Sequence, residues 1–130
     1  MNGLLRGTGA ALARFLSRPV ASYRPLATSP FASLDASLRR GDVLLVEGDT
    51  RIAGAIKYLT QSTWSHAALC LGRGVVGDRE FECNALIEVD LVDGVRLVPA
   101  SRYAAHHTRI CRPLGLADEE LSDLARLALV

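Results

Sequence analysis

Apolar and polar residues alternate in ways that predict a strand-rich body in the second part of the chain. Five segments have the pattern of strands: residues 43–46, 66–71, 81–91, 95–99 and 108–112. The third is the clearest, because apolar side chains occupy every second position and only Leu86 breaks the alternation. We therefore expect a half-buried strand, with Glu88 on its polar side. Asp93-Gly94 is a hairpin turn signal between the third and fourth strands.

Apolar residues at helical spacing predict three helices: residues 3–18, residues 51–60 and a final helix that starts near Glu119. The final helix has an apolar face and reaches Val130 without a glycine cap or a polar tail. We therefore expect the sequence to continue beyond residue 130.

The N-terminal part differs from the rest in charge and in composition. Residues 1–40 contain six arginines and one acidic residue, whereas residues 41–130 contain nine basic and thirteen acidic residues, so a segment of net charge +5 precedes one of −4. Residues 19–37 carry three prolines and five serines or threonines, which predicts an extended linker. We divide the chain into residues 1–38, a basic amphipathic helix with its linker, and residues 39–130, the folded domain.

The helix predicted over residues 3–18 allows several interpretations. Its broad apolar face is flanked by Arg6, Arg14 and Arg18, an arrangement that suits the surface of an anionic membrane. The alternatives are a helix that packs on its own domain, a disordered arm, and an organelle transit peptide, which is also rich in arginine and poor in acidic residues.

Composition narrows the class of protein further. The chain has 130 residues, 49% of them hydrophobic, which fits one globular domain. No apolar stretch approaches the ~20 residues of a membrane-spanning helix, and a net charge of +1 gives no reason to expect a nucleic-acid partner. Three cysteines without a CxxC spacing argue against a disulfide scaffold and a structural zinc site. We expect a reduced, cytoplasmic protein whose only membrane contact, if it has one, is peripheral and made by residues 3–18.

Candidate chemistry centres on His66 and Glu88. Histidine is the usual general base near neutral pH, and His66 opens a predicted strand beside a turn. If the strand that carries Glu88 pairs with this strand, the carboxylate can orient the imidazole. The alternative interpretation makes His66 a structural residue and Glu88 a solvent-facing side chain.

None of the three cysteines is a convincing nucleophile for that base. Cys70 lies four residues after His66 on the same strand, which separates the two by roughly 13 Å at ~3.4 Å per residue. Cys83 shares the apolar side of its strand, opposite to Glu88, and is expected to be buried. Cys111 is expected on an edge strand.

The sequence gives little support for a metal or a cofactor. His106 and His107 are adjacent and would point to opposite sides of a strand, so we do not expect them to bind one ion. The run GRGVVG at 72–77 lacks the Lys-Ser/Thr pair of a phosphate-binding loop and predicts a hairpin loop instead. We predict neither a metal nor a cofactor.

The ordered segments resemble one known family. Residues 39–72 (RRGDVLLVEGDTRIAGAIKYLTQSTWSHAALCLG) and 85–103 (ALIEVDLVDGVRLVPASRY) are similar to the circularly permuted branch of the NlpC/P60 papain-like hydrolases, and more narrowly to its YiiX/YebB-like group. The shared features are a Gly-Asp turn into a first strand, a helix, and a Ser-His pair that opens a strand. A strand with Ile-Glu, a hairpin and a Pro-x-Ser-x-Tyr stretch follow.

The resemblance implies an α+β, circularly permuted papain-like fold, with an antiparallel sheet and flanking helices, that residues 39–130 complete only in part. It implies a cysteine hydrolase that cleaves an amide or ester bond in a small-molecule, lipid or peptide substrate. His66 matches the general base and Glu88 the residue that orients it, while Asp42 and Ser65 match as structural residues. In this branch the nucleophilic cysteine follows at the start of a later helix. We therefore expect it beyond residue 130, and we expect the chain to be inactive alone.

Two other hypotheses compete with this one. A non-catalytic, membrane-associated binding module would keep the fold without the chemistry. A metal or redox protein is disfavoured by the spacings above. A cysteine encoded after residue 130, followed by serine or threonine, would favour the hydrolase, and a stop codon would favour the binding module.

Overall fold

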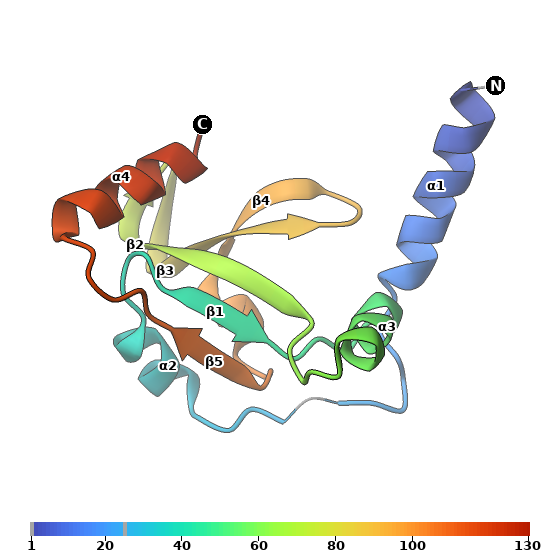
Figure 1. The fold of residues 1–130 in the computed structure, drawn as a ribbon, viewed down its shortest axis with the longest axis horizontal. Coiled ribbons are helices and arrows are strands. Elements are labelled where there is room, and N and C mark those ends of the chain that lie inside the picture. Colours follow the sequence, from blue (N-terminus) through green and yellow to red (C-terminus); the bar gives the residue numbers. More distant parts are fainter. Residues whose placement is uncertain (1, 25) are drawn as a thin grey trace.

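A computed structural model describes residues 2–24 and 26–130. The described residues form an α+β fold on one five-stranded antiparallel sheet, with the strand order β4-β3-β2-β1-β5 (Figure 1). The strands are β1 Val43–Val46, β2 His66–Val76, β3 Arg79–Asp90, β4 Gly94–Pro99 and β5 Thr108–Cys111. The predicted α+β class, with an antiparallel sheet and flanking helices, is therefore confirmed.

Helices pack on both sides of this sheet. The described helices are α1 Asn2–Leu16, α2 Phe31–Ser37, α3 Arg51–Thr60 and α4 Asp118–Ala128, and a short 3-10 helix, η1, spans Ala100–Tyr103. On one side, α2 and η1 pack on a core cluster that includes Leu44 and Leu86. On the other side, α4 packs through Ala125 on a second core cluster, which includes Phe81. Both sides of the central strands are consequently buried.

Strand β3 is buried where the sequence predicted solvent. Asn84 and Glu88 are each 3% exposed and Leu86 is fully buried, so the predicted polar side of the strand faces the core. Val89 and Leu91, on the predicted apolar side, are more than half exposed, because the β3–β4 hairpin extends beyond α4 (Figure 1). The alternative interpretation of Glu88 as a solvent-facing side chain is therefore wrong. Because β3 is buried on both sides, the alternation of apolar and polar residues along it does not distinguish a buried side from a solvent-exposed side.

The glycine-rich segment within residues 72–77 also differs from the prediction. Residues 72–76 continue β2, so the predicted hairpin loop is wrong. The pairing of β2 with β3 shifts register twice around Gly72. Because such shifts change which side chains share a side of the sheet, Cys83 packs on the core cluster of Leu86 and not on the opposite side.

Helix α2 lies in the segment that was predicted to be an extended linker. Leu34 packs against the first core cluster. The carboxylate of Asp35 accepts hydrogen bonds from the backbone N–H and the side-chain amide of Asn84, at 2.9 and 2.7 Å, and pairs with Arg73 at 2.5 Å. The linker prediction is therefore wrong for residues 31–37, because this short helix is stabilised by partners far along the chain that no local pattern reveals.

Helix α1 confirms the predicted N-terminal helix, and its C-terminal end is attached to α3. The guanidinium of Arg51 lies 4.0 Å over the ring of Phe15, and the backbone N–H of Arg51 donates to the carbonyl oxygen of Arg18 at 3.2 Å. Pro19 forms a β-bridge with Thr50. The rest of α1 projects away from the sheet (Figure 1). Among the helices described, none is long and apolar enough to cross a membrane.

Candidate functional site

Strand pairing brings His66 and Glu88 together. His66 is the first residue of β2 and lies opposite Val46 of β1, while Glu88 lies on β3 along the other edge of β2. The Nε2 atom of His66 is 2.8 Å from Oε2 of Glu88. The Glu88 side chain is fully buried, whereas 29% of the His66 side chain is exposed. This is the arrangement in which the carboxylate of Glu88 can orient the imidazole of His66.

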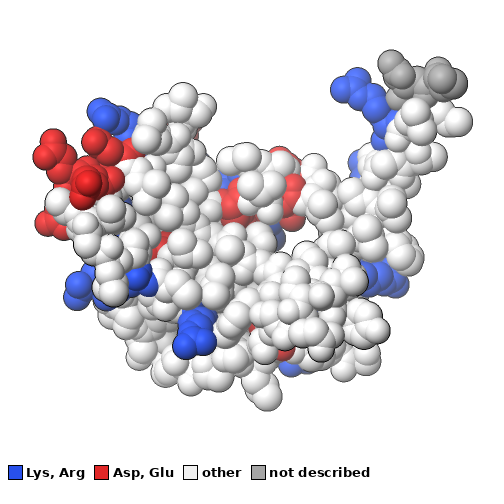
Figure 2. Space-filling view, in the orientation of Figure 1, with Lys and Arg blue, Asp and Glu red and all other residues white. Residues whose placement is uncertain are grey.

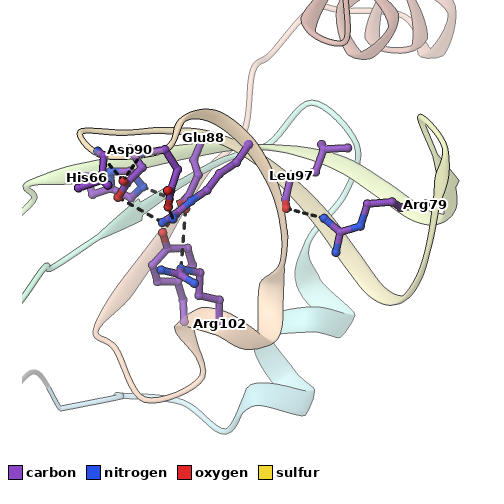
Figure 3. A network of polar contacts seen from close by, with 10 residues as sticks. His66, Arg79, Glu88, Asp90, Leu97 and Arg102 are labelled. Carbon is purple, nitrogen blue, oxygen red and sulfur yellow. Dashed lines mark hydrogen bonds and ion pairs between the residues drawn. The ribbon is translucent and has the colours of Figure 1, made fainter. Parts of the chain in front are cut away.

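Three hydrogen-bond donors hold Glu88 as a carboxylate (Figure 3). His66 and the hydroxyl of Tyr103 donate to Oε2, and Nε of Arg96 donates to Oε1 at 2.8 Å. Nε of Arg102 lies 3.8 Å from Oε1. Burial by itself would raise the pKa of Glu88, but the hydrogen bonds from His66, Tyr103 and Arg96 lower it from 4.5 to about 2. Glu88 is therefore ionised at every pH at which the protein is expected to work.

The partners of Glu88 are themselves fixed. Burial raises the pKa of Tyr103, and its hydrogen bond to Glu88 raises that pKa further, so the phenol keeps its proton and acts as a donor. Arg96 also pairs with Asp90 at 3.3 Å and with Asp93 at 2.8 Å. These contacts leave the carboxylate of Glu88 little freedom to change its position.

An ionised Glu88 decides which ring nitrogen of His66 carries the hydrogen. A carboxylate only accepts hydrogen bonds, so we assign the hydrogen to Nε2 of His66 and the lone pair to Nδ1. No hydrogen bond within the described part of the chain engages Nδ1. The neutral ring therefore has its basic nitrogen available for another group.

Close contacts at the start of β2 position His66. The backbone N–H of Gly48 donates to Oγ of Ser65 at 2.9 Å. A Cβ atom at Gly48 would lie 2.8 Å from that oxygen and 2.9 Å from Cβ of Ala53, so this approach requires glycine. The hydroxyl of Thr50 caps α3 by accepting from the backbone N–H of Ala53 at 3.2 Å. Ser65 thus has the structural role that the sequence predicted.

Asp42 has a structural role as well. It is almost fully buried in the turn before β1, where Oδ2 accepts from the backbone N–H of Arg39 at 2.9 Å and pairs with Arg112 at 2.8 Å. Burial would raise the pKa of Asp42, but the contacts with Arg112 and Arg39 lower it. These contacts connect the turn to the segment after β5, at a distance from the His66–Glu88 pair.

A cavity of about 640 Å³ opens beside His66. Its polar lining includes two carboxylates and five larger side chains: Asp49, Asp90, His66, Arg96, Arg102, Tyr103 and His106. Its apolar walls come from α3 and from the β3–β4 hairpin: Ile52, Ala53, Ile56, Val89 and Leu91. Figure 2 shows the surface hollowed between this hairpin and α1. A cavity of this size, with apolar walls and a few polar groups, suits a small organic ligand or part of a larger one.

The cysteines of the chain do not line this cavity. Cys70 is fully buried with its Sγ 3.6 Å from Oδ1 of Asn84, and burial raises the pKa of its thiol. Cys83 packs against the first core cluster. Cys111 is exposed on β5, the edge strand that the sequence predicted for it. None of the three is placed to exchange a proton with His66.

The sequence did not identify Arg96, Arg102 and Tyr103 as residues of the site. Arg96 faces Glu88 across the β3–β4 hairpin in the register that the predicted turn sets, so the hairpin signal contained enough information to find it. Tyr103 reaches Glu88 from η1. A helix as short as η1 has no periodic pattern by which it could be predicted. The only signal for Tyr103 in the sequence was the Pro-x-Ser-x-Tyr stretch.

The two adjacent histidines lie in different surroundings, but they precede β5 and are not on a strand as the sequence predicted. His106 lines the cavity, with its ring edge-on to Tyr103 at 5.5 Å. Nδ1 of His107 lies 3.1 Å from Oε2 of Glu47, and His107 is not part of the cavity lining. Within residues 2–24 and 26–130, no three His, Cys, Asp or Glu side chains are grouped so that they would hold a metal ion.

The site therefore combines a histidine bound to a buried carboxylate, two arginines and apolar walls around one cavity. Its chemistry has to be inferred from this geometry, because no protein-family model and no curated protein matches the chain.

Proposed function

We propose that the chain is part of a cysteine hydrolase of the circularly permuted papain-like, NlpC/P60 type, which cleaves an amide or ester bond. The observation that carries the proposal is the 2.8 Å hydrogen bond between His66, which lines the cavity, and the fully buried Glu88. A histidine whose tautomer and orientation are fixed by a buried carboxylate is the proton acceptor that a thiol nucleophile requires.

In the proposed reaction, Nδ1 of His66 accepts the proton of a cysteine thiol, and the thiolate attacks the carbonyl carbon of the substrate. The tetrahedral intermediate collapses when the protonated His66 returns that proton to the leaving amine or alcohol, and the acyl group remains on sulfur as a thioester. Water then gives a proton to the same nitrogen as it attacks the thioester. Collapse of the second intermediate releases the acid, and the proton on His66 returns to the thiolate.

Glu88 does not exchange a proton in this sequence. Its pKa of about 2 keeps it ionised while the imidazole cycles between its neutral and charged forms. Glu88 keeps the hydrogen on Nε2, so that Nδ1 is the nitrogen presented to the thiol. Tyr103 and Arg96 act through Glu88 and are positioning residues.

The nucleophilic thiol is proposed to come from polypeptide outside residues 1–130. Two observations support this: the cysteines of the described chain do not line the cavity, and Nδ1 of His66 has no hydrogen-bond partner in the described residues. The resemblance to the permuted hydrolases implies the same order, with histidine before cysteine. Residues 1–130 alone are therefore expected to have no turnover.

The test is a pre-steady-state burst with a 4-nitrophenyl acyl ester. It compares residues 1–130 with the chain as its gene encodes it past codon 130. We expect a burst of nitrophenolate and one acylated cysteine, identified by mass spectrometry, in the longer chain alone. His66→Ala is expected to slow the burst by about 10²- to 10⁴-fold, the usual contribution of a general base.

His107→Ala is the matched control. His107 is also paired with a carboxylate, that of Glu47, but it does not line the cavity, so its replacement should leave the burst unchanged. A burst that persists in His66→Ala contradicts the proposal, and so does a gene that encodes no further cysteine.

A binding module without catalysis is the second candidate. The observation in its favour is that the cavity holds a polar floor and apolar walls but no cysteine from the described chain. This candidate predicts that a ligand binds in the cavity with no acylated residue in any version of the chain.

A further inference from the structure

Helix α1 has an apolar face that no other described element covers. Leu4, Leu5 and Leu12 are between 58% and 79% exposed, and Phe15 at the base of the helix is half exposed. At ~100° per residue these four side chains fall within an arc of about 100° on one side of the helix. The leucines therefore form a stripe in which Thr8 lies between Leu5 and Leu12, with its hydroxyl donating to the carbonyl oxygens of Leu4 and Leu5. One end of the stripe is held at the domain by the contact of Phe15 with Arg51.

Every charged side chain of α1 is basic, and one acidic residue, Asp49, lies near its base, where it lines the cavity together with Ser17 and Pro19. Arg6 and Arg14 lie away from the leucine stripe, Arg18 follows the helix, and residues 1–34 contain no acidic residue. In Figure 2 the visible side of α1 shows basic and uncharged side chains and no acidic ones. A helix with an apolar stripe on one side and only arginines as charged residues elsewhere matches an anionic bilayer, where leucines enter the acyl boundary and guanidinium groups remain near the phosphates.

We infer that α1 docks the protein on an anionic membrane surface and that this docking brings the mouth of the cavity to the lipid headgroups. The partner is identified by its chemistry, an apolar interface beneath a layer of negative charge. The inference concerns where the protein binds and does not depend on the proposed hydrolase.

The junction between α1 and the sheet sets where the bilayer would meet the protein. The backbone N–H of Arg51 donates to the carbonyl oxygen of Arg18, and Pro19 is bridged to Thr50, so the helix leaves the domain from a fixed point. Ser17 and Pro19 at this point line the same cavity as His66. A membrane-bound α1 therefore holds the cavity within a few residues of the headgroup layer.

The β3–β4 hairpin contributes apolar surface on the other wall of the cavity but no attraction to anionic lipid. Val89 and Leu91 line the cavity and are more than half exposed. The neighbouring Asp90 and Asp93 are negative, and the single guanidinium of Arg96 offsets them only in part. The hairpin is therefore not the source of the electrostatic attraction, which we assign to the arginines of α1, and variants of these arginines test it directly.

The test is co-sedimentation of the whole chain with phosphatidylcholine vesicles that contain about one third phosphatidylglycerol, and with vesicles of phosphatidylcholine alone. We expect binding to the anionic vesicles at low salt, and weak binding to the neutral vesicles and at about 0.5 M salt. The double variant Arg6→Gln/Arg14→Gln should lower the partition coefficient about 30-fold, or about fivefold for each arginine. Leu5→Glu/Leu12→Glu should lower it at least about tenfold.

The matched control is Arg109→Gln/Leu114→Glu. It removes one exposed arginine of β5 and changes one exposed leucine between β5 and α4, neither of which belongs to α1 or lines the cavity, and it should bind as the unchanged chain does. Circular dichroism verifies that each variant keeps its helix content. Because the arginine variant keeps the leucine stripe intact, it stays informative if the leucine variant loses helix.

Three results would overturn the inference. The first is that the unchanged chain does not sediment with anionic vesicles. The second is that the arginine variant binds them as well as the control. The third is sedimentation-velocity evidence of a dimer that Leu5→Glu/Leu12→Glu abolishes while vesicle binding is absent. That last outcome would assign the stripe to a second copy of the chain, whose residues 41–130 carry a net charge of −4.

Discussion

Glutamine in place of Glu88 should reveal how strongly the buried carboxylate stabilises the fold. Glu88→Gln keeps the size of the side chain but leaves the guanidinium of Arg96 and the Nε2–H of His66 beside a neutral amide. In the unchanged protein both donors are 2.8 Å from a carboxylate that is fully buried. Because a neutral amide replaces the carboxylate, both charge-assisted hydrogen bonds are weakened, and we expect the variant to be less stable at neutral pH.

The pKa of Glu88 gives the size of the effect. It falls from 4.5 to about 2 on folding, and each unit corresponds to ~1.4 kcal/mol, so the ionised form contributes about 3 kcal/mol to the free energy of unfolding. The unfolded chain binds the proton more tightly than the folded chain, so stability falls as the pH falls between these two values. The contribution is fully present above pH 4.5 and is lost below about pH 2.

The assay is urea unfolding followed by the fluorescence of Trp64, the single tryptophan, over a series of pH values. The difference in the free energy of unfolding between the unchanged protein and Glu88→Gln should be about 3 kcal/mol near neutral pH. It should approach zero near the acid limit, where a protonated Glu88 resembles glutamine. Asp123→Asn, in an exposed pair with Arg126, is the control and should cost less than about 1 kcal/mol throughout. A difference that is independent of pH, or that grows as the pH falls, would refute the reasoning.

Three further outcomes are expected. Tyr103→Phe removes one of the two donors to Oε2 of Glu88, so it should lower the free energy of unfolding by about 1.5–3 kcal/mol. It should also raise the pKa of Glu88, so that acid unfolding occurs at a higher pH. An unchanged midpoint of acid unfolding would count against this contact. Nitrogen NMR of the imidazole should show His66 with its hydrogen on Nε2, and this preference should weaken in Glu88→Gln; an Nδ1-protonated ring would contradict the assigned tautomer. A thiol reagent should modify the exposed Cys111 at once and the buried Cys70 only as fast as the chain unfolds, with the fast phase absent in Cys111→Ser; equal rates for the two thiols would show that Cys70 is accessible.

Local patterns of apolar and polar residues were sufficient to predict those helices and strands whose burial depends on their own residues. The apolar run Val43–Val46 became β1, and the periodic residues of 51–60 became α3, whose N-cap is Thr50. Strand β3 was different, because helices pack on both sides of the sheet and bury Asn84 and Glu88 with specific hydrogen-bond partners. Whether a polar side chain faces solvent or a buried partner is decided by tertiary contacts.

The same division applies to the site. His66 and Glu88 were proposed together on the condition that their strands lie side by side, and the sheet meets that condition. Arg96 was implicit in the hairpin register. Tyr103 was not, since its distance from Glu88 depends on how η1 packs after β4 ends. The charged residues of the network can therefore be predicted from strand order and hairpin register. The contact of Tyr103 with Glu88 can be found only from the complete fold.

Helix α2 determines where an intact folding unit can begin. Composition suggests a boundary at residue 39, but a chain cut there would lose the carboxylate of Asp35, and both donors of Asn84 would be left without an acceptor inside the core. Each such unsatisfied buried group costs about 1–3 kcal/mol, a large share of the ~5–15 kcal/mol that stabilises a small domain. The N-cap of α2 is Pro30, so a shortened protein that begins there would keep these bonds. Residues 1–29 could accordingly be replaced by another N-terminal segment without loss of the hydrogen bonds between Asp35 and Asn84.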